Sequence, residues 1–109
     1  MVKNSLDVRT RTMQRDLIVE EFKEFVEANQ QMHYMWAESR ADCLKELADL
    51  VYVCYQFAMN MGWDLDEALH RVHASNLSKL GEDGKPVRRE DGKVLKGPNY
   101  EPPTLTDLV

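Results

Sequence analysis

The chain has 109 residues, of which 43% are hydrophobic and 30% are charged, a composition typical of one small globular domain rather than of a disordered segment. Its formal net charge of −5 argues against a nucleic-acid-binding surface, which is usually basic, but not against a nucleotide whose phosphates a metal ion neutralises. No apolar run approaches the roughly 18 residues that cross a membrane, and none follows the polar residues 1–5, so we expect neither a membrane anchor nor a signal peptide.

The first helical pattern begins near Met13, with Thr12 as the expected N-cap. One face of this helix repeats at helical spacing and consists of Leu17, Ile18, Glu21, Phe25 and Ala28. Glu21 and Glu24 border the apolar face instead of lying opposite to it. Carboxylates beside a core need a partner, which makes these two glutamates candidates for a functional site.

Residues 29–37 are expected to be a connection. Ser39 followed by Asp42 resembles a helix N-cap with an acid at the third helical position. A long second helix is then predicted to run to about Asn60 and to end at Gly62.

The second helix is expected to be the most deeply buried element. Its predicted apolar stripe is Leu44, Leu47, Ala48, Val51, Tyr55 and Ala58. Residues 50–59 are almost wholly apolar and present more apolar surface than two short flanking helices can cover. A dimer or tetramer is therefore predicted with this helix at the interface.

Cys43 and Cys54 lie roughly 16 Å apart on one helix at about 1.5 Å per residue, too far for a disulfide. We expect reduced thiols and a cytoplasmic protein.

Asp64 and Glu67 form a second capping pattern, which opens a helix from Leu65 to about Leu80. From Gly81 onward, glycine, proline, lysine and aspartate dominate. There, two short apolar segments flank the Asp-Gly turn of residues 91–92, which predicts a β-hairpin followed by an extended, proline-containing tail. A lone hairpin is marginal in water, so we expect it to dock on the helices.

Two pairs of carboxylates carry the functional hypothesis. Glu21 and Glu24, like Glu46 and Asp49, are three residues apart, so each pair shares one helix face with Cβ atoms roughly 5–6 Å apart. Two such pairs on helices that pack roughly 8–10 Å apart form a nest of acids that a hard divalent cation stabilises. Oxygen-only ligation suits Mg²⁺ or Mn²⁺. For any single glutamate, a solvated acidic surface is the simpler interpretation.

A basic rim accompanies these acids. Its members are Asn76, Lys79, Arg88, Lys93 and Lys96, and together they suit a triphosphate. Taken alone, Lys79 is better explained by the dipole at a helix C-terminus, and Arg88, Lys93 and Lys96 by solubility of the hairpin. Glu67 and His70 raise a rival interpretation, because di-iron bundles use a Glu-x-x-His motif on two helices. Only one such motif is present here, and Glu67 already belongs to a cap.

Three motifs, in this order and spacing, resemble a known superfamily. They are Glu20-Glu21-x-x-Glu24, Glu46-x-x-Asp49 and Ser75-Asn76-x-x-Lys79. The chain resembles the MazG-like all-α nucleoside triphosphate pyrophosphohydrolases, which are related to the phosphoribosyl-ATP pyrophosphohydrolases and to the all-α dUTPases and dCTPases. The resemblance spans about residues 14–80, with one copy of the motif set where longer members have two.

The resemblance implies an all-α fold in which a helical bundle is completed by oligomerisation, as a homodimer or homotetramer. It implies one domain over residues 1–109, with a helical core at about 13–80 and a hairpin and tail at 81–109. It also implies Mg²⁺-dependent hydrolysis of a (deoxy)nucleoside triphosphate to a monophosphate and pyrophosphate, Mn²⁺ being the other suitable ion.

The same resemblance assigns roles to individual residues. The implied metal ligands are Glu21, Glu24, Glu46 and Asp49. Glu20 is expected to orient the attacking water, and Asn76 and Lys79 to contact phosphates. The hairpin lysines Lys93 and Lys96 are added to the expected substrate-binding residues because they belong to the basic rim. Two alternatives stay open: phosphoribosyl-ATP hydrolysis in histidine biosynthesis, and a non-catalytic helical metal-binding or regulatory module. The expected partner is a nucleotide, not a nucleic acid or a membrane.

Overall fold

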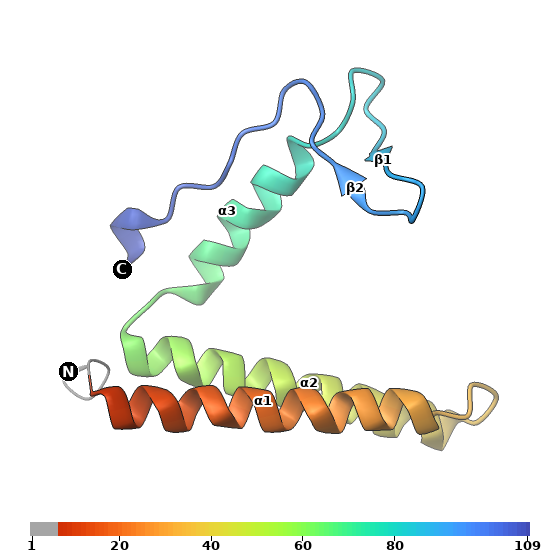
Figure 1. Cartoon of the computed structure of the whole chain (residues 1–109), viewed down its shortest axis with the longest axis vertical. Coiled ribbons are helices and arrows are strands. Elements are labelled where there is room, and N and C mark those ends of the chain that lie inside the picture. Colours follow the sequence, from red (N-terminus) through yellow and green to blue (C-terminus); the bar gives the residue numbers. More distant parts are fainter. Residues whose placement is uncertain (1–6) are drawn as a thin grey trace. The chain divides into compact units, whose positions relative to one another are not determined.

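The computed structural model describes residues 7–109, so the N-terminal stretch on which the absence of a signal peptide was predicted lies outside the described residues. In chain order, the elements are α1 (Val8–Gln31), α2 (Ala37–Met61), α3 (Leu65–Leu77), β1 (Val87–Arg88), β2 (Val94–Leu95) and the 3-10 helix η2 (Thr106–Leu108) (Figure 1). The predicted all-α class with a short C-terminal hairpin is therefore confirmed. Among the described helices, none is both long and apolar enough to cross a bilayer.

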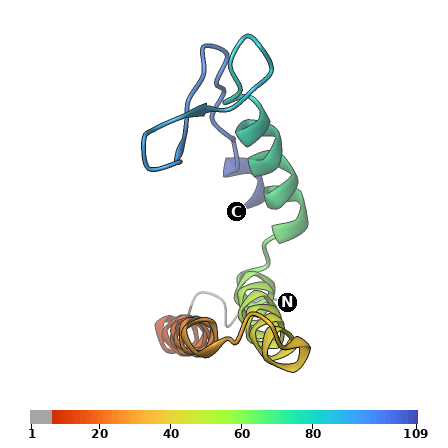
Figure 2. The same ribbon diagram turned by 90° about the vertical axis from the view of Figure 1, so that its right-hand side faces the viewer.

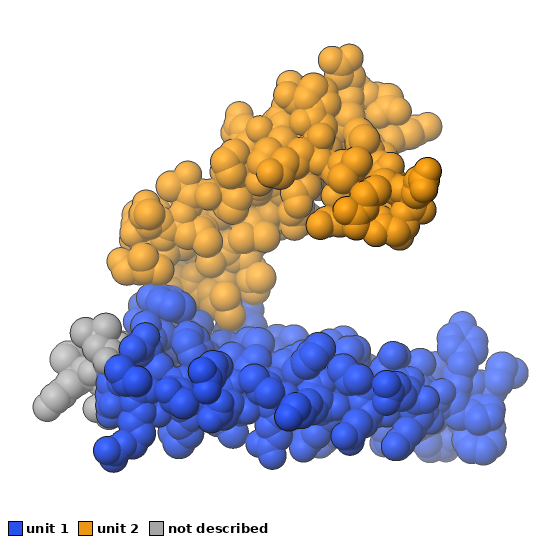
Figure 3. Space-filling model, in the orientation of Figure 1, with its two compact units in different colours: residues 1–63 blue, residues 64–109 orange. Residues whose placement is uncertain are grey.

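The chain forms two compact units, which are described separately here: unit 1 ends at Trp63, and unit 2 is Asp64–Val109 (Figure 3). In unit 1, α1 and α2 pack side by side as a helical hairpin, which is seen end-on in Figure 2. The predicted inner face of α1 is confirmed, because all its members are partly buried: Leu17, Ile18, Glu21, Phe25 and Ala28.

Helix α1 begins earlier than the apolar pattern predicted. Its first residue is Val8 rather than Met13, and its N-cap is Asp7, whose Oδ1 accepts a hydrogen bond from the backbone N–H of Arg9 at 2.9 Å. Thr12 lies inside the helix. The first turns are mostly solvent-exposed, so they need no apolar residues, and a good cap followed by arginines is sufficient to form them.

Helix α2 also begins differently from the prediction, at Ala37, after the N-cap residue Trp36, whose side chain makes no capping bond. Ser39 is not the N-cap. Its hydroxyl instead accepts a hydrogen bond from the backbone N–H of His33 at 2.6 Å, which ties the connection to the first turn of α2. The rings of His33 and Trp36 stack at 4.0 Å, so the connection is ordered by its own side chains.

The predicted end of α2 is confirmed. Gly62 adopts the left-handed conformation with φ 73°, and its N–H bonds to the carbonyls of the last helical turn. The two cysteines are free thiols, as their separation predicted: Cys43 is buried and Cys54 is half-buried.

Most of the apolar stripe predicted for α2 is exposed in the single chain, and only Ala58 of its six members is buried. Within the single chain, Leu44 is 65% exposed, and Leu47, Val51 and Tyr55 are also exposed, whereas the buried apolar residues of this helix are Cys43, Val53 and Ala58. The burial predicted for residues 50–59 is therefore wrong for a single chain. One neighbouring helix covers only one face, and apolar residues surround more than half of α2. We call Leu44, Leu47, Val51 and Tyr55 the exposed apolar face of α2.

In unit 2, the start of α3 is as predicted. The N-cap Asp64 accepts a hydrogen bond from the backbone N–H of Glu67 at 3.0 Å. The Glu67 carboxylate does not complete a capping box, because it accepts a hydrogen bond from Arg71 at 2.8 Å. The helix ends at Leu77 rather than at Leu80, which forms an isolated β-bridge with Pro86.

The predicted hairpin is confirmed. Its strands pair antiparallel, with Val87 opposite Leu95 and Arg88 opposite Val94. Gly92 supplies the positive φ of 90° that the Asp-Gly turn requires.

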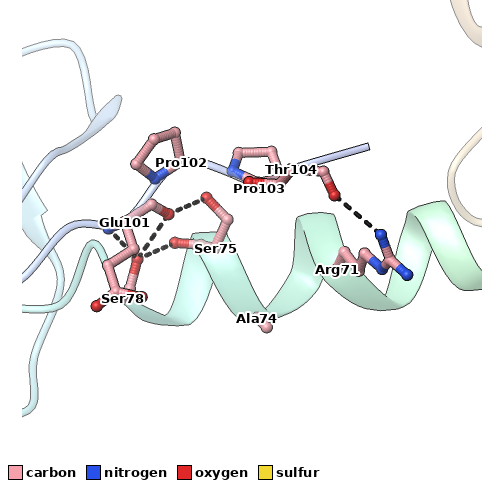
Figure 4. A pocket seen from close by; sticks show the side chains of 8 residues that line it. All are labelled: Arg71, Ala74, Ser75, Ser78, Glu101, Pro102, Pro103 and Thr104. Atoms are coloured by element: carbon pink, nitrogen blue, oxygen red, sulfur yellow. Dashed lines mark hydrogen bonds between the residues drawn. The ribbon is translucent and has the colours of Figure 1, made fainter. Parts of the chain in front are cut away.

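The C-terminal tail folds back along α3 and is fastened to it by hydrogen bonds, as Figure 4 shows. The Ser75 hydroxyl donates to the carbonyl of Glu101 at 2.7 Å, and the N–H of Glu101 donates to the hydroxyl of Ser78 at 2.9 Å. Further along, Arg71 donates to the carbonyl of Thr104 and pairs with Asp107. Between helix and tail lies a hollow of about 350 Å³. The tail leaves Ser75 only 6% exposed.

The pair between Arg71 and Asp107 predicts that acid releases this end of the tail. Hydrogen bonds from Arg71 hold the pKa of Asp107 below its ordinary value of 3.8. The contribution of this pair is therefore present above pH 3.8 and is lost as the pH falls through the lowered pKa. We expect the amide NMR signals of residues 104–109 to shift in that window. In Asp107→Asn they should already be shifted at neutral pH, and a wild-type titration that leaves them in place would contradict the prediction.

Candidate metal centre and phosphate-binding residues

Three carboxylates converge between the two helices of unit 1. Glu21 of α1 and Glu46 and Asp49 of α2 each place one oxygen within 4.8 Å of the other two, and all three residues are half-buried. Packing α1 against α2 produces this arrangement, because Glu21 lies on the inner face of α1 and Glu46 is one turn from Asp49. We call these three residues the acid cluster.

Two oxygens of the acid cluster have no hydrogen-bond partner. Glu21 Oε2 and Glu46 Oε2 are both buried, and neither is bonded to any atom of the described residues. A buried carboxylate oxygen without a partner is costly, and two of them side by side repel. A hard divalent cation ligated by oxygen satisfies both atoms, so the residues present fit a site for Mg²⁺ or Mn²⁺.

Glu24, the fourth predicted ligand, lies beside the acid cluster rather than within it. Its side chain is exposed and lies close enough to Glu21 to interact with that carboxylate. Hydrogen bonding with Glu21, followed by the negative charge of Glu21, raises the pKa of Glu24 above its ordinary value of 4.5, and the charges of Glu46 and Glu20 act in the same direction. The structure thus places all four predicted ligands in one negatively charged region, with Glu20 at its edge.

Lys45 is a member of this site that the sequence reasoning missed. Its ammonium nitrogen lies 2.8 Å from Asp49 Oδ2 and 3.5 Å from Glu46 Oε1. The hydrogen bond to Asp49 and the charges of both acids raise the pKa of Lys45. The lysine therefore partly neutralises the acid cluster when no cation is bound. Its i,i+4 spacing to Asp49 was visible in the sequence, but such pairs are common on helix surfaces and carry little functional information.

A hollow of about 430 Å³ opens beside the acid cluster. It is lined by Ala28, Gln31, Ser39, Asp42, Lys45 and Glu46. Its volume falls within the range of small-molecule sites. Asp42 adds a further acid one turn before Glu46, and Lys45 adds a cation, so the hollow combines acidic side chains with a group that can contact an anion. Glu20 instead lines a shallow hollow along α1.

In unit 2, the structure brings together three of the four predicted phosphate-binding residues. Asn76 and Lys79 line a hollow of about 360 Å³ together with Leu80, Pro86 and Val94. The ammonium groups of Lys79 and Lys96 lie 6.0 Å and 4.9 Å from the centre of the Tyr100 ring. Tyr100 was missed by the sequence reasoning, because a lone tyrosine in a tail carries no periodic signal.

Lys93 and His70 are not part of these groups. Lys93 lies at the hairpin turn, where its backbone bonds to Arg89 and to Asp91, and it lines neither the hollow nor the Tyr100 ring. Among residues 7–109, the acid cluster contains no histidine, and Glu67 is engaged by Arg71. The di-iron alternative therefore gains no support.

Comparison with known proteins identifies the family. No curated protein matches the chain significantly. The family model for phosphoribosyl-ATP pyrophosphohydrolase matches residues 3–76, more than half of the chain. The matched segment contains the acid cluster and Asn76 and ends before Lys79. The chain therefore belongs to the phosphoribosyl-ATP pyrophosphohydrolase family, within the MazG-like all-α superfamily, and is a pyrophosphohydrolase that acts on phosphoric anhydrides of nucleotide-like substrates.

Proposed function

We propose that this enzyme hydrolyses a (deoxy)nucleoside triphosphate to the monophosphate and pyrophosphate with the help of Mg²⁺, for which Mn²⁺ can substitute. The observation that carries the proposal is the pair of buried, unbonded carboxylate oxygens of Glu21 and Glu46 inside the acid cluster. In a pyrophosphohydrolase, the phosphates of the substrate are expected to bind at the site that holds a divalent cation.

Glu21, Glu46 and Asp49 would hold the ion, and Glu24 would join them from the side. When bound, the ion supplies polarisation of a phosphoryl oxygen and a lowered pKa of water. Glu20 is proposed to orient the attacking water, because it adjoins Glu21 and its charge reaches Glu24. Lys45 would turn from the acids toward the phosphates, since the cation takes over its neutralising role.

The phosphates of the substrate need hydrogen-bond donors and positive charge from the protein. Asn76 offers an amide, and Lys79 and Lys96 offer ammonium groups that stabilise charge on the departing pyrophosphate. A role of Lys93 in phosphate binding stays a prediction, because no contact with Asn76, Lys79 or Lys96 is described for it. The proposal treats residues 1–109 as one domain, in which the acids belong to unit 1 and these donors to unit 2. It also includes a homodimer or homotetramer, which the exposed apolar face of α2 supports.

A second candidate substrate is phosphoribosyl-ATP. The observation in its favour is the name of the matching family. The chemistry is the same, attack at the phosphorus next to the nucleoside with loss of pyrophosphate, so a substrate panel separates the two candidates. A non-catalytic metal-binding module is disfavoured because all four acids, Asn76 and Lys79 are present together.

The proposal predicts which phosphorus is attacked. In ¹⁸O-labelled water with a deoxynucleoside triphosphate and Mg²⁺, we expect the label in the monophosphate and none in the pyrophosphate, as read by mass spectrometry. Boiled enzyme and a reaction with EDTA serve as controls, and both should give no product. Release of orthophosphate with a nucleoside diphosphate would exclude this reaction. No hydrolysis of any nucleotide, phosphoribosyl-ATP included, would favour the non-catalytic module.

A further inference from the structure

Two lysines distant in the sequence meet at one aromatic ring in unit 2. Lys79 follows α3 and Lys96 follows β2, and both ammonium groups lie near the ring of Tyr100 in the tail. Within residues 7–109, neither lysine forms an ion pair, whereas Lys45, Arg71 and Arg89 each pair with a carboxylate. Two positive charges without a carboxylate partner therefore lie within 6.0 Å of the centre of one ring.

Gathering two ammonium groups costs electrostatic energy unless something offsets their repulsion. The negative face of an aromatic ring attracts a cation within about 6 Å of its centre, so Tyr100 supplies part of that offset. The ring carries no net charge, and it leaves both cations able to bind an anion. An anion with at least two negative charges, such as a diphosphate, is the ligand whose charge matches this arrangement.

The position of Tyr100 is fixed on both sides by backbone contacts. On one side, a Cβ atom at Gly97 would overlap the carbonyl oxygens of Lys79 and Leu80, 2.6 Å from the first of them, so only glycine permits this close approach. On the other side, Glu101 is hydrogen-bonded to Ser75 and Ser78. The segment that carries Tyr100 is thus fastened at both ends to residues 75–80, which include Asn76 and Lys79.

We propose that Tyr100 is a positioning residue that holds Lys79 and Lys96 as a pair for the pyrophosphate part of the substrate. The hollow lined by Asn76, Leu80, Pro86 and Val94 adjoins Lys79 and would receive the neighbouring part of that ligand. The identification of the anion rests on the proposed function. The family match ends at residue 76, so this role of the tail goes beyond what the family implies.

Binding of inorganic pyrophosphate to the full-length chain in metal-free buffer tests the proposal, because without a cation the acid cluster repels the probe. By titration calorimetry, we expect Tyr100→Leu to weaken binding about fivefold, the effect of losing two exposed cation–π contacts. Tyr100→Phe keeps the ring and should stay within about twofold of wild type. Lys96→Gln should weaken binding as much as Tyr100→Leu or more. Lys85→Gln, which removes a lysine away from the ring, is the matched control and should bind normally.

The kinetic counterpart in Tyr100→Leu is a rise in KM for the nucleotide together with a fall in kcat, because the two lysines also stabilise the departing pyrophosphate, and Tyr100→Phe should restore both. Wild-type pyrophosphate binding in either Tyr100→Leu or Lys96→Gln would overturn the proposal. A shift of the Glu101 amide signal would show that Tyr100→Leu detaches the tail. In that case the test is whether Lys96→Gln weakens pyrophosphate binding while Lys85→Gln does not. A chain that hydrolyses no nucleotide but loses pyrophosphate binding in these variants would refute the proposed function while supporting the lysine pair.

Discussion

Glu46→Gln is expected to reduce turnover by about a hundredfold or more while leaving the fold intact. Glu46 contributes an oxygen to the acid cluster, carries one of its two unbonded buried oxygens and lines the adjoining hollow. Glutamine keeps the shape of the side chain and removes the charge that a cation needs. Steady-state kinetics with Mg²⁺ and with Mn²⁺ measure the loss, and calorimetry should show a matching loss of metal affinity.

The thermal stability of Glu46→Gln should not fall with its turnover. In metal-free buffer, Glu46→Gln should unfold at the same temperature as wild type or at a higher one, because the repulsion within the acid cluster is relieved. A cation that binds only the folded state stabilises it by about 2.7 kcal/mol at a hundred times its Kd, so adding Mg²⁺ should raise the melting temperature of wild type but not of the variant.

Glu27→Gln is the matched control, since Glu27 is an exposed glutamate of α1 that is absent from the acid cluster and from the charges that act on Glu24. It should retain turnover and metal affinity. Full activity in Glu46→Gln would refute the assignment of the metal site.

The acid cluster was predictable because i,i+3 spacing on a helix is a local property. Glu21 and Glu46 needed only the helical repeat and an apolar border to be singled out. Lys45 was not singled out, because a lysine one turn from an aspartate is common on any helix surface. Tyr100 depends on a contact between the tail and the end of α3, and no local pattern encodes such a long-range contact.

Errors at the helix starts have a similar origin. The apolar repeat of α1, which starts near Met13, does not mark where the helix backbone begins, because an N-cap at Asp7 can start a helix whose first turns are mostly exposed. Ser39 had the chemistry of a cap, but its hydroxyl accepts a hydrogen bond from the backbone N–H of His33 in the connection.

The error about which face of α2 is buried gives information about assembly, unlike the errors at the helix starts. Apolar residues surround more than half of this helix, so the pattern gave two candidate faces and no means of deciding which one α1 covers. The buried side is the one with Cys43 and Val53, and the longer stripe is left uncovered. An exposed apolar surface of this extent, in a chain of this size, is the reason to expect a second copy of the chain against it.

Val51→Glu should therefore convert the proposed oligomer into monomers. Val51 is 46% exposed in the single chain and lies in the middle of the exposed apolar face of α2, between Leu47 and Tyr55. Placing a carboxylate there buries an unpaired charge in the proposed interface, which should weaken association by about a hundredfold or more. Light scattering at micromolar concentration measures the change, and circular dichroism should show that the helices remain.

Gln56→Glu provides the control, because it adds the same charge to the same helix on the opposite flank, two turns after Asp49. It should leave the oligomer unchanged. If association is needed for catalysis, Val51→Glu should also lose activity, and the loss should diminish as protein concentration rises, since mass action restores the assembly. A wild-type chain that is monomeric, folded and active at micromolar concentration would contradict the interface, and the exposed face of α2 would then have to be covered within one chain.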